Sequence, residues 1–203
     1  MEQMLKVGIL ASGRGSNFQA IVDASKEGEL EAEIVVLVSD KEGAKVLERA
    51  EKEGIDNYYL NPKNSETKEE FEKKLAAILE KKGVQLVVMA GFMRLLSPYF
   101  IKHYRHQVMN IHPSLLPSFK GLNAQKQALE YGVKVTGCTV HFADEGMDTG
   151  PIILQKSVSV KDDDTVNSLA ARIRKEEHKV YPRAIQLYAE DRLEVKEGRV
   201  YIK

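Results

Sequence analysis

Short continuous apolar runs alternate with helical segments through the first half of the chain. The apolar runs are Leu5–Ala11, Ile34–Val38 and Leu86–Ala90. The segments with helical patterning are Phe18 to about Glu27, Gly43–Gly54 and Thr67–Lys82, and Asn57–Leu60 is a weak further strand. Continuously apolar strands are typical of parallel sheets covered on both faces, and a β-α-β-α order builds such sheets. We therefore expect an α/β fold with a doubly wound, mostly parallel, Rossmann-like sheet and helices on both faces.

The second half predicts a different order of elements. We expect a strand at Val108–Ile111, a helix at Asn123–Tyr131, two extended runs at Val135–Phe142 and Ile152–Val160, a helix from about Thr165, and a hairpin at Leu193–Ile202. Asp162–Asp164 can cap the long helix, and Pro182 must kink or interrupt it. Because there is no repeat, low-complexity tract or linker, we predict a single domain over residues 1–203, with a nucleotide-binding front half at about 1–100.

The composition excludes several classes of protein. The 203 residues carry 30 Lys and Arg against 30 Asp and Glu, so the net charge is zero and bulk nucleic-acid binding is not expected. A single cysteine, Cys138, allows no intrachain disulfide and fits a reducing compartment. The N-terminal apolar stretch is too short for a signal peptide, and no run approaches the roughly 18 residues that span a membrane. We expect a cytoplasmic protein acting on small molecules, either monomer or homodimer.

The segment SGRGSN, Ser12–Asn17, lies between the first expected strand and the first expected helix. Glycines allow a tight turn there, and the helix N-terminus offers unpaired N–H groups to an anion. Phe18 takes the place of the third glycine of a dinucleotide fingerprint, and a Walker loop would need a GK[ST] ending. The favoured interpretation is a mononucleotide or sugar-phosphate site. The alternative is a plain glycine turn with Ser16 or Asn17 as helix cap.

Three polar residues of the second half form a candidate catalytic group. Asn110 closes a strand, and its amide can donate a hydrogen bond to a developing oxyanion without titrating. His112 titrates near neutral pH and can act as a general acid or base. Asp148 lies in the loop sequence GMDTGP, and a carboxylate near an imidazole favours its charged form. Each residue alone also has an ordinary structural explanation, and the combination favours chemistry.

Other candidates carry less weight. Pro113 is expected to hold the segment after His112 extended. Cys138 and His141 have C-x-x-H spacing, but residues three apart on a strand point to opposite faces, so we predict no metal site. His103 and His106 are expected at a solvated helix end. The stretch AGFMRLLSP, residues 90–98, is expected to be a core strand running into a helix start. Its basic side chain, Arg94, is either a surface charge or an anion contact.

Several longer motifs together resemble one family. They are ILASGRGSNFQAI, AGFMRLLSP, NIHPSLLPSFKG, GCTVHFADEGMDTGPIILQ and EEHKVYP, and they cover nearly the whole chain. The sequence resembles the folate-dependent phosphoribosylglycinamide formyltransferases of purine biosynthesis. The resemblance implies transfer of a formyl group from 10-formyltetrahydrofolate to the amine of glycinamide ribonucleotide, with no metal, and a rear half, about 101–203, that binds folate and holds the catalytic groups.

The resemblance also implies residue roles. The substrate phosphate would be bound by Gly15, Ser16 and Asn17. Folate would be bound by Lys68, Met93, Arg94, Leu95, Leu96 and Asn110. Asn110, His112 and Asp148 would be catalytic, and Glu177 would contact the glycinamide end.

Three alternatives share parts of this pattern. A formyltetrahydrofolate deformylase would use the same cofactor, but we expect it to carry an additional N-terminal regulatory domain. A methionyl-tRNA formyltransferase would need an RNA-binding C-terminal domain and a basic surface. A non-catalytic nucleotide-binding module would tolerate loss of Asn110, His112 and Asp148, and their joint presence argues against it.

Overall fold

Residues 4–203 are described by the computed structural model, which divides into the units Met1–Met109 and Asn110–Lys203. The elements of the first unit are β1 (Leu5–Ala11), α1 (Ser16–Lys26), β2 (Ala32–Ser39), α2 (Lys45–Lys52), β3 (Asn57–Tyr59), a 3-10 turn (Pro62–Asn64), α3 (Lys68–Lys81), β4 (Leu86–Met89) and α4 (Pro98–His103). The predicted strands and helices of this half are confirmed, with boundaries that differ by at most two residues. In the 90–98 stretch the expected helix start is confirmed at Pro98, but the part before it is a loop and not a core strand.

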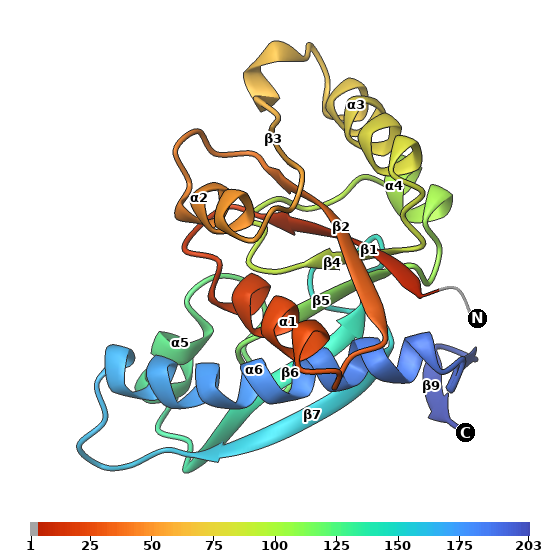
Figure 1. Ribbon diagram of the computed structural model, residues 1–203. Coiled ribbons are helices and arrows are strands. Elements are labelled where there is room, and N and C mark those ends of the chain that lie inside the picture. Colours follow the sequence, from red (N-terminus) through yellow and green to blue (C-terminus); the bar gives the residue numbers. More distant parts are fainter. Residues whose placement is uncertain (1–3) are drawn as a thin grey trace. The chain divides into compact units, whose positions relative to one another are not determined.

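The strands of the first unit are all parallel. β1 pairs with β2 on one side and with β4 on the other, and β2 pairs with β3. Right-handed crossovers then put α1 and α2 on one face of the sheet and α3 on the other, as Figure 1 shows. A side chain at Gly8 would meet Leu79 of α3 within 2.8 Å, so this glycine lets α3 pack closely on β1. The chain reverses its winding between β1 and β4, the place where doubly wound sheets bind ligands.

The elements that follow include an antiparallel strand pair, and the boundary between the two units falls within the first of them. They are β5 (Val108–His112), α5 (Ala124–Tyr131), β6 (Val135–Phe142), β7 (Ile152–Ser159), α6 (Val166–Ala189), β8 (Leu193–Lys196) and β9 (Arg199–Ile202). β6 and β7 are antiparallel, and β8 and β9 form the predicted hairpin. The strand order of the large sheet is β3-β2-β1-β4-β5-β6-β7, so the predicted α/β, mostly parallel fold is confirmed. The prediction of one domain over 1–203 stays a prediction.

Helix α6 packs on β6 and β7 through an apolar cluster. The cluster consists of Cys138, Val158, Leu169 and Ile173, all of them buried. Figure 1 shows α6 running across the strand pair. Along β6 the side chains alternate, so Cys138 and Val140 face one way and Thr139 and His141 the other. This alternation separates an apolar face covered by α6 from a polar face.

Helix α6 differs from expectation at its start and at Pro182. The helix is capped by Thr165, whose side chain accepts from the Ser168 N–H, and not by Asp162–Asp164. Ser168 returns a bond to Thr165, which completes a capping box. Of the two outcomes expected at Pro182, a kink or an interruption, the interruption is wrong, because the helix runs for 24 residues. A proline removes one helical donor, and Pro182 and its neighbour Tyr181 are both buried, so tertiary packing stabilises the helix through this position.

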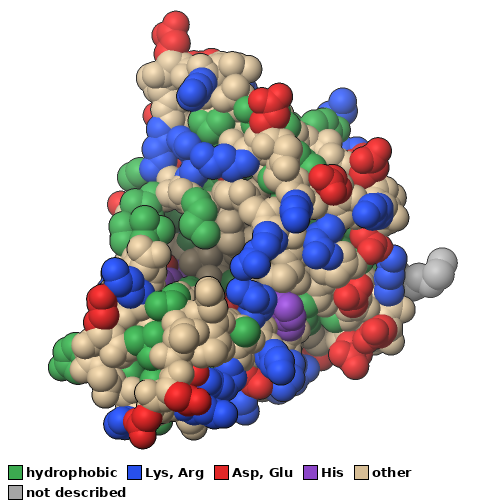
Figure 2. All heavy atoms as spheres, turned by 90° about the vertical axis from the view of Figure 1, so that its left-hand side faces the viewer, with side chains coloured by type: hydrophobic (Ala, Val, Ile, Leu, Met, Phe, Trp, Pro, Cys, Tyr) green, Lys and Arg blue, Asp and Glu red, His purple; other side chains and the backbone are tan. Residues whose placement is uncertain are grey.

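Charges of both signs are interspersed on the face drawn in Figure 2, which agrees with the zero net charge. No helix within residues 4–203 has the length and apolar character that a membrane span requires.

The register of β6 against β7 depends on a glycine. A Cβ on Gly137 would lie 1.9 Å from the Lys156 carbonyl oxygen and 2.9 Å from the Leu115 side chain. We expect Gly137→Ala to lower the free energy of unfolding by about 1–3 kcal/mol, the usual cost of overpacking, as measured by urea denaturation. Gly13→Ala is the matched control, because no atom lies within 4 Å of its added Cβ. Equal stability of the two variants would contradict the close packing described here.

Candidate active site

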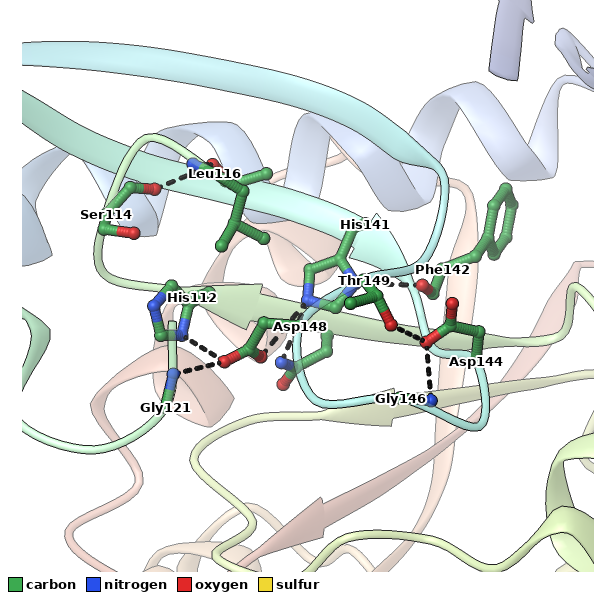
Figure 3. A network of polar contacts seen from close by, with 12 residues as sticks. His112, Ser114, Leu116, Gly121, His141, Phe142, Asp144, Gly146, Asp148 and Thr149 are labelled. Carbon is green, nitrogen blue, oxygen red and sulfur yellow. Dashed lines mark hydrogen bonds and ion pairs between the residues drawn. The ribbon is translucent and has the colours of Figure 1, made fainter. Parts of the chain in front are cut away.

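Asn110, His112 and Asp148 lie together in the second unit, as Figure 3 shows for His112 and Asp148. His112 ends β5 and is 5% exposed. Its Nδ1 lies 3.2 Å from Asp148 Oδ2, and its Nε2 lies 2.8 Å from the Phe119 carbonyl oxygen. A carbonyl oxygen only accepts hydrogen bonds, so Nε2 carries a hydrogen and the Nδ1 atom faces the carboxylate. The two contacts fix the ring between an anion and a backbone dipole.

The loop that follows β6 presents Asp148. Asp148 has a positive φ of 52°, a conformation that aspartate tolerates better than most residues. The Gly121 N–H donates to its Oδ2 at 2.8 Å. Asp144 organises the same loop, because its Oδ1 accepts from the Gly146 N–H and from the Thr149 hydroxyl (Figure 3). A Cβ on Gly150 would lie 1.8 Å from the Phe142 carbonyl oxygen, so the chain can return into β7 only through a glycine.

His141 also belongs to this group of residues, and the sequence interpretation missed it. Its Nε2 lies 3.2 Å from Asn110 Nδ2 and 3.7 Å from Asp148 Oδ1. Its Nδ1 donates to the Phe142 carbonyl oxygen at 2.9 Å, so in the neutral ring Nε2 is the acceptor for the Asn110 amide. In the sequence His141 attracted notice only through its spacing from Cys138. The signal that could have identified it is the alternation along β6, which puts His141 and Thr139 on the polar face of the strand.

The electrostatics of the pair have several opposing causes. Burial lowers the pKa of His112 below its ordinary value, against the Phe119 carbonyl and the Asp148 charge, which raise it. Burial alone would raise the pKa of Asp148, but the neighbouring His141, the bond from the Gly121 N–H and the His112 charge together lower it. Asp148 is therefore an anion at neutral pH, and its charge favours the protonated form of His112, whereas burial disfavours that form and lowers the pKa overall.

The segment after His112 is not extended, so the expectation about Pro113 is wrong. The Ser114 N–H donates to the His112 carbonyl oxygen at 2.9 Å, and the Ser114 hydroxyl donates to the Ser118 carbonyl oxygen at 2.5 Å. The buried hydroxyl of Thr139 on β6 donates to the Ser114 carbonyl and accepts from the Leu116 N–H. These bonds fold the segment into consecutive turns, and the turns place the Phe119 carbonyl against His112.

In the first unit, the glycine-rich loop (residues 12–17) leads into α1. Gly15 is the N-cap residue at φ 74°, and no side chain caps the helix there, so the expectation of a Ser16 or Asn17 cap is wrong. A Cβ on Gly15 would lie 2.5 Å from Val46 of α2. Backbone N–H groups at the start of this eleven-residue helix point out of its N-terminus, where an anion is favoured. Ser16 and Asn17 occupy the first turn.

Met93, Arg94, Leu95 and Leu96 lie in the 91–97 segment, which joins β4 to α4. Met93 and Leu95 are 67% and 54% exposed, whereas Leu96 is buried. The Arg94 guanidinium lies 5.2 Å from the centre of the Phe71 ring on α3. Lys68 is the first residue of α3, one turn before Phe71, so helical spacing places it on the same helix face.

Glu177 lies on α6, the helix that packs on β6 and β7. It is 9% exposed. Burial raises the pKa of the Cys138 thiol to about 12, and the Glu177 charge adds to the effect. The structure brings Asn110, His112 and Asp148 together, and the role of Glu177 stays a prediction.

The remaining candidate groups are surface or structural features. Within residues 4–203 no group of three His, Cys, Asp or Glu side chains could hold a metal ion. His103, at the end of α4, forms an ion pair with Glu80 at 2.8 Å, in keeping with the predicted solvated helix end.

Comparisons with known proteins agree on one family. The formyl transferase family model matches residues 5–185. A phosphoribosylglycinamide formyltransferase of Bacillus subtilis is 47% identical over 183 residues, covering 90% of this chain and 94% of that protein. A trifunctional purine biosynthetic protein adenosine-3 of Gallus gallus is 46% identical over 96% of this chain, which spans only 19% of that relative's length.

Solved structures give the same result. The glycinamide ribonucleotide transformylase 1 of Symbiobacterium toebii has a TM-score of 0.97 and 47% identity, covering 100% of this chain and 95% of that one. A formyltetrahydrofolate deformylase of Pseudomonas syringae is more distant, at 30% identity and a TM-score of 0.91, and this chain covers 66% of it. With a family model matching most of its length and relatives near 47% identity, this chain belongs to the formyl transferase family.

Proposed function

We propose that this chain transfers a formyl group from 10-formyltetrahydrofolate to the amine of glycinamide ribonucleotide, giving N-formylglycinamide ribonucleotide and tetrahydrofolate in purine (IMP) biosynthesis. The observation that carries the proposal is the contact between His112 Nδ1 and the Asp148 carboxylate at 3.2 Å, with the Asn110 amide joined to Asp148 through His141. An amide donor beside a buried imidazole–carboxylate pair suits a reaction that develops an oxyanion.

Residues of the first unit are proposed to bind the substrates. Gly15, Ser16 and Asn17 would hold the ribonucleotide phosphate at the N-terminus of α1, because helix N-termini bind anions. The exposed side chains of Met93 and Leu95 would contact the folate pterin ring. Lys68 would contact the folate carboxylates. From the second unit, Glu177 would contact the glycinamide end.

The mechanism follows from the donors present. The substrate amine attacks the formyl carbon, a C–N bond forms, and the formyl oxygen becomes an oxyanion. An amide nitrogen carries two hydrogens, so Asn110 can bond to His141 with one and to the oxyanion with the other. The positive charge of protonated His112 stabilises the same oxyanion. The intermediate collapses by breaking the bond from carbon to N10, which gains a proton while the amine loses one.

The protonation of His112 is the step that Asp148 controls. Both ring nitrogens face acceptors, the Phe119 carbonyl and the Asp148 carboxylate, and only the imidazolium can donate to both. Burial opposes that charge and lowers the pKa of His112. Asp148 is proposed to offset the burial, so that a useful fraction of His112 is charged at neutral pH.

Two alternatives differ in what accepts the formyl group. A deformylase would give it to water, and a non-catalytic module would bind ligands without turnover. The Asn110–His112–Asp148 group supports formyl transfer either to water or to an amine. The sequence identity is greater to the transformylase than to the deformylase, which favours the amine of the ribonucleotide as the acceptor. The proposal includes small-molecule substrates without nucleic acid or membrane, a cytoplasmic setting, and a monomer or homodimer.

The deciding experiment mixes the purified chain with 10-formyltetrahydrofolate, with and without glycinamide ribonucleotide, and follows release of tetrahydrofolate. Release that requires the ribonucleotide supports the proposal. Release without it identifies a deformylase, and no release from folded protein leaves the binding module.

We expect His112→Ala and Asp148→Asn each to lower kcat at least about 100-fold, because each variant removes part of the charge that stabilises the oxyanion. Steady-state formyl transfer measures kcat, and circular dichroism checks the fold. His103→Ala is the control, because His103 contacts Glu80 on the surface and should keep normal turnover. Near-normal kcat in either test variant would remove that residue from the catalytic group.

The pKa of His112 can be measured by NMR titration of its ring protons. We expect a pKa below the ordinary 6.5, because burial penalises the charged ring. Asp148→Asn should lower this pKa further, because the neutral amide no longer stabilises the imidazolium. If the imidazolium is the active form, wild-type activity falls as pH rises through the His112 pKa. A His112 pKa that rises in Asp148→Asn would contradict the proposed role of the carboxylate.

A further inference from the structure

Ser12 joins two segments that are far apart in sequence. Its hydroxyl donates to Asp40 Oδ1 at 2.6 Å and accepts from the Met93 N–H at 2.9 Å. Its own N–H donates to the Gly91 carbonyl oxygen at 3.1 Å. Ser12 begins the glycine-rich loop, and Gly91 and Met93 begin the 91–97 segment. One residue therefore ties the segment proposed to bind phosphate to the segment proposed to bind folate.

The position of Asp40 shows that this contact is built into the sheet. Ser12, Asp40 and Gly91 each lie one or two residues beyond the carboxyl ends of β1, β2 and β4, which are neighbours in the sheet. Asp40 is only 4% exposed. In dinucleotide-binding folds an acidic residue after the second strand binds a ribose hydroxyl. Here the acidic group binds the hydroxyl of the protein's own Ser12.

The other end of the 91–97 segment is held separately. Glu72 on α3 accepts from the Ser97 N–H at 2.8 Å and from the Ser97 hydroxyl. Arg94 lies over the ring of Phe71, the preceding residue of the helix. The segment is thus fixed at both ends, with its exposed apolar side chains Met93 and Leu95 between them, and its Ser12 end meets the glycine-rich loop.

We propose that Ser12 and Asp40 are positioning residues that couple ribonucleotide binding to folate binding. A hydroxyl has one hydrogen, and its bond to Asp40 turns a lone pair toward the Met93 N–H. An anion held at the start of α1 restricts the loop that carries Ser12, and Ser12 in turn restricts Met93. The second ligand then finds a segment that is already ordered and binds more tightly, because the entropy of ordering has been lost already. This inference rests on the proposed function.

The test measures the dissociation constant of tetrahydrofolate by calorimetry, with and without saturating glycinamide ribonucleotide. This pair cannot react, because tetrahydrofolate carries no formyl group. In the wild type we expect the ribonucleotide to tighten tetrahydrofolate binding about five-fold or more, the usual lower range of coupling between sites. In Ser12→Ala both ligands should still bind, and the ratio of the two constants should fall to about one.

Matched variants separate coupling from simple structural support. Asp40→Asn keeps an oxygen that accepts from Ser12 and should retain most of the coupling, whereas Asp40→Ala should lose it. Glu72→Gln alters the Ser97 end of the segment, so it should change tetrahydrofolate affinity while leaving the ratio as in the wild type. A purely structural role for Ser12 would lower affinities without changing the ratio. Thermal melting of each variant confirms that it is folded.

The outcomes separate this inference from the proposed function. If the wild type binds both ligands and transfers formyl but shows a ratio of one, coupling is overturned and the function stands. A wild-type ratio retained in Ser12→Ala likewise overturns it. Failure of the wild type to bind the ribonucleotide and to transfer formyl removes the proposed function and this inference together.

Discussion

A carboxylate that is almost buried sets the arrangement of the second unit. The side chain of Asp148 is 12% exposed, and a buried charge is costly unless it is paired and hydrogen-bonded. His112, His141 and the Gly121 N–H supply the compensation, and they come from β5, β6 and the segment before α5. Those three parts of the chain must therefore converge on one atom group. The same compensation holds the imidazole in the orientation that the proposed mechanism requires, so in that proposal stability and function depend on one contact.

The backbone around this carboxylate is restricted in conformation and in space. Asp148 has positive φ, and Gly150 lies too close to the Phe142 carbonyl for any side chain. The alternation of β6 provides the second requirement. Cys138 and Val140 pack toward α6, and Thr139 and His141 face the turns and the carboxylate. The strand β6 thus has the apolar core on one face and the hydrogen-bonded site on the opposite face, and it separates the two.

The glycine-rich loop and the 91–97 segment are positioned by the topology of the sheet and not by a buried charge. Their positions come from the carboxyl ends of parallel strands, which always meet at one edge of a sheet. Ser12 then adds a specific connection between them through Asp40 and Met93. Elements placed by topology are in this way joined by a few polar contacts. Such contacts are separate from the backbone hydrogen bonds that form the sheet, which suits them to the proposed coupling of two ligands.

Local patterns in the sequence predicted what local physics controls. Continuous apolar runs identified β1, β2 and β4, and the helical pattern over Thr67–Lys82 identified α3. The same patterns failed where partners from elsewhere decide the conformation. Pro182 lies inside an unbroken helix because packing offsets its lost donor, and the segment after Pro113 forms turns because Thr139 bonds to it across the fold. A cap at Asp162–Asp164 and a cap at Thr165 were indistinguishable without backbone angles.

For the candidate site as well, some features could be predicted from the sequence and others are visible only in the tertiary structure. By itself the sequence determined the α/β fold and the glycine-rich loop, and it singled out Asn110, His112 and Asp148 as the candidate catalytic group, because residue type and spacing along the chain carry that information. Only the tertiary structure decided that His141 joins the site, that the Phe119 carbonyl holds His112, and that Ser12 meets Asp40 and Met93. These contacts join residues from different elements through donors whose direction depends on the fold. Sequence spacing cannot specify such directions, because they arise only when strands and loops are packed together.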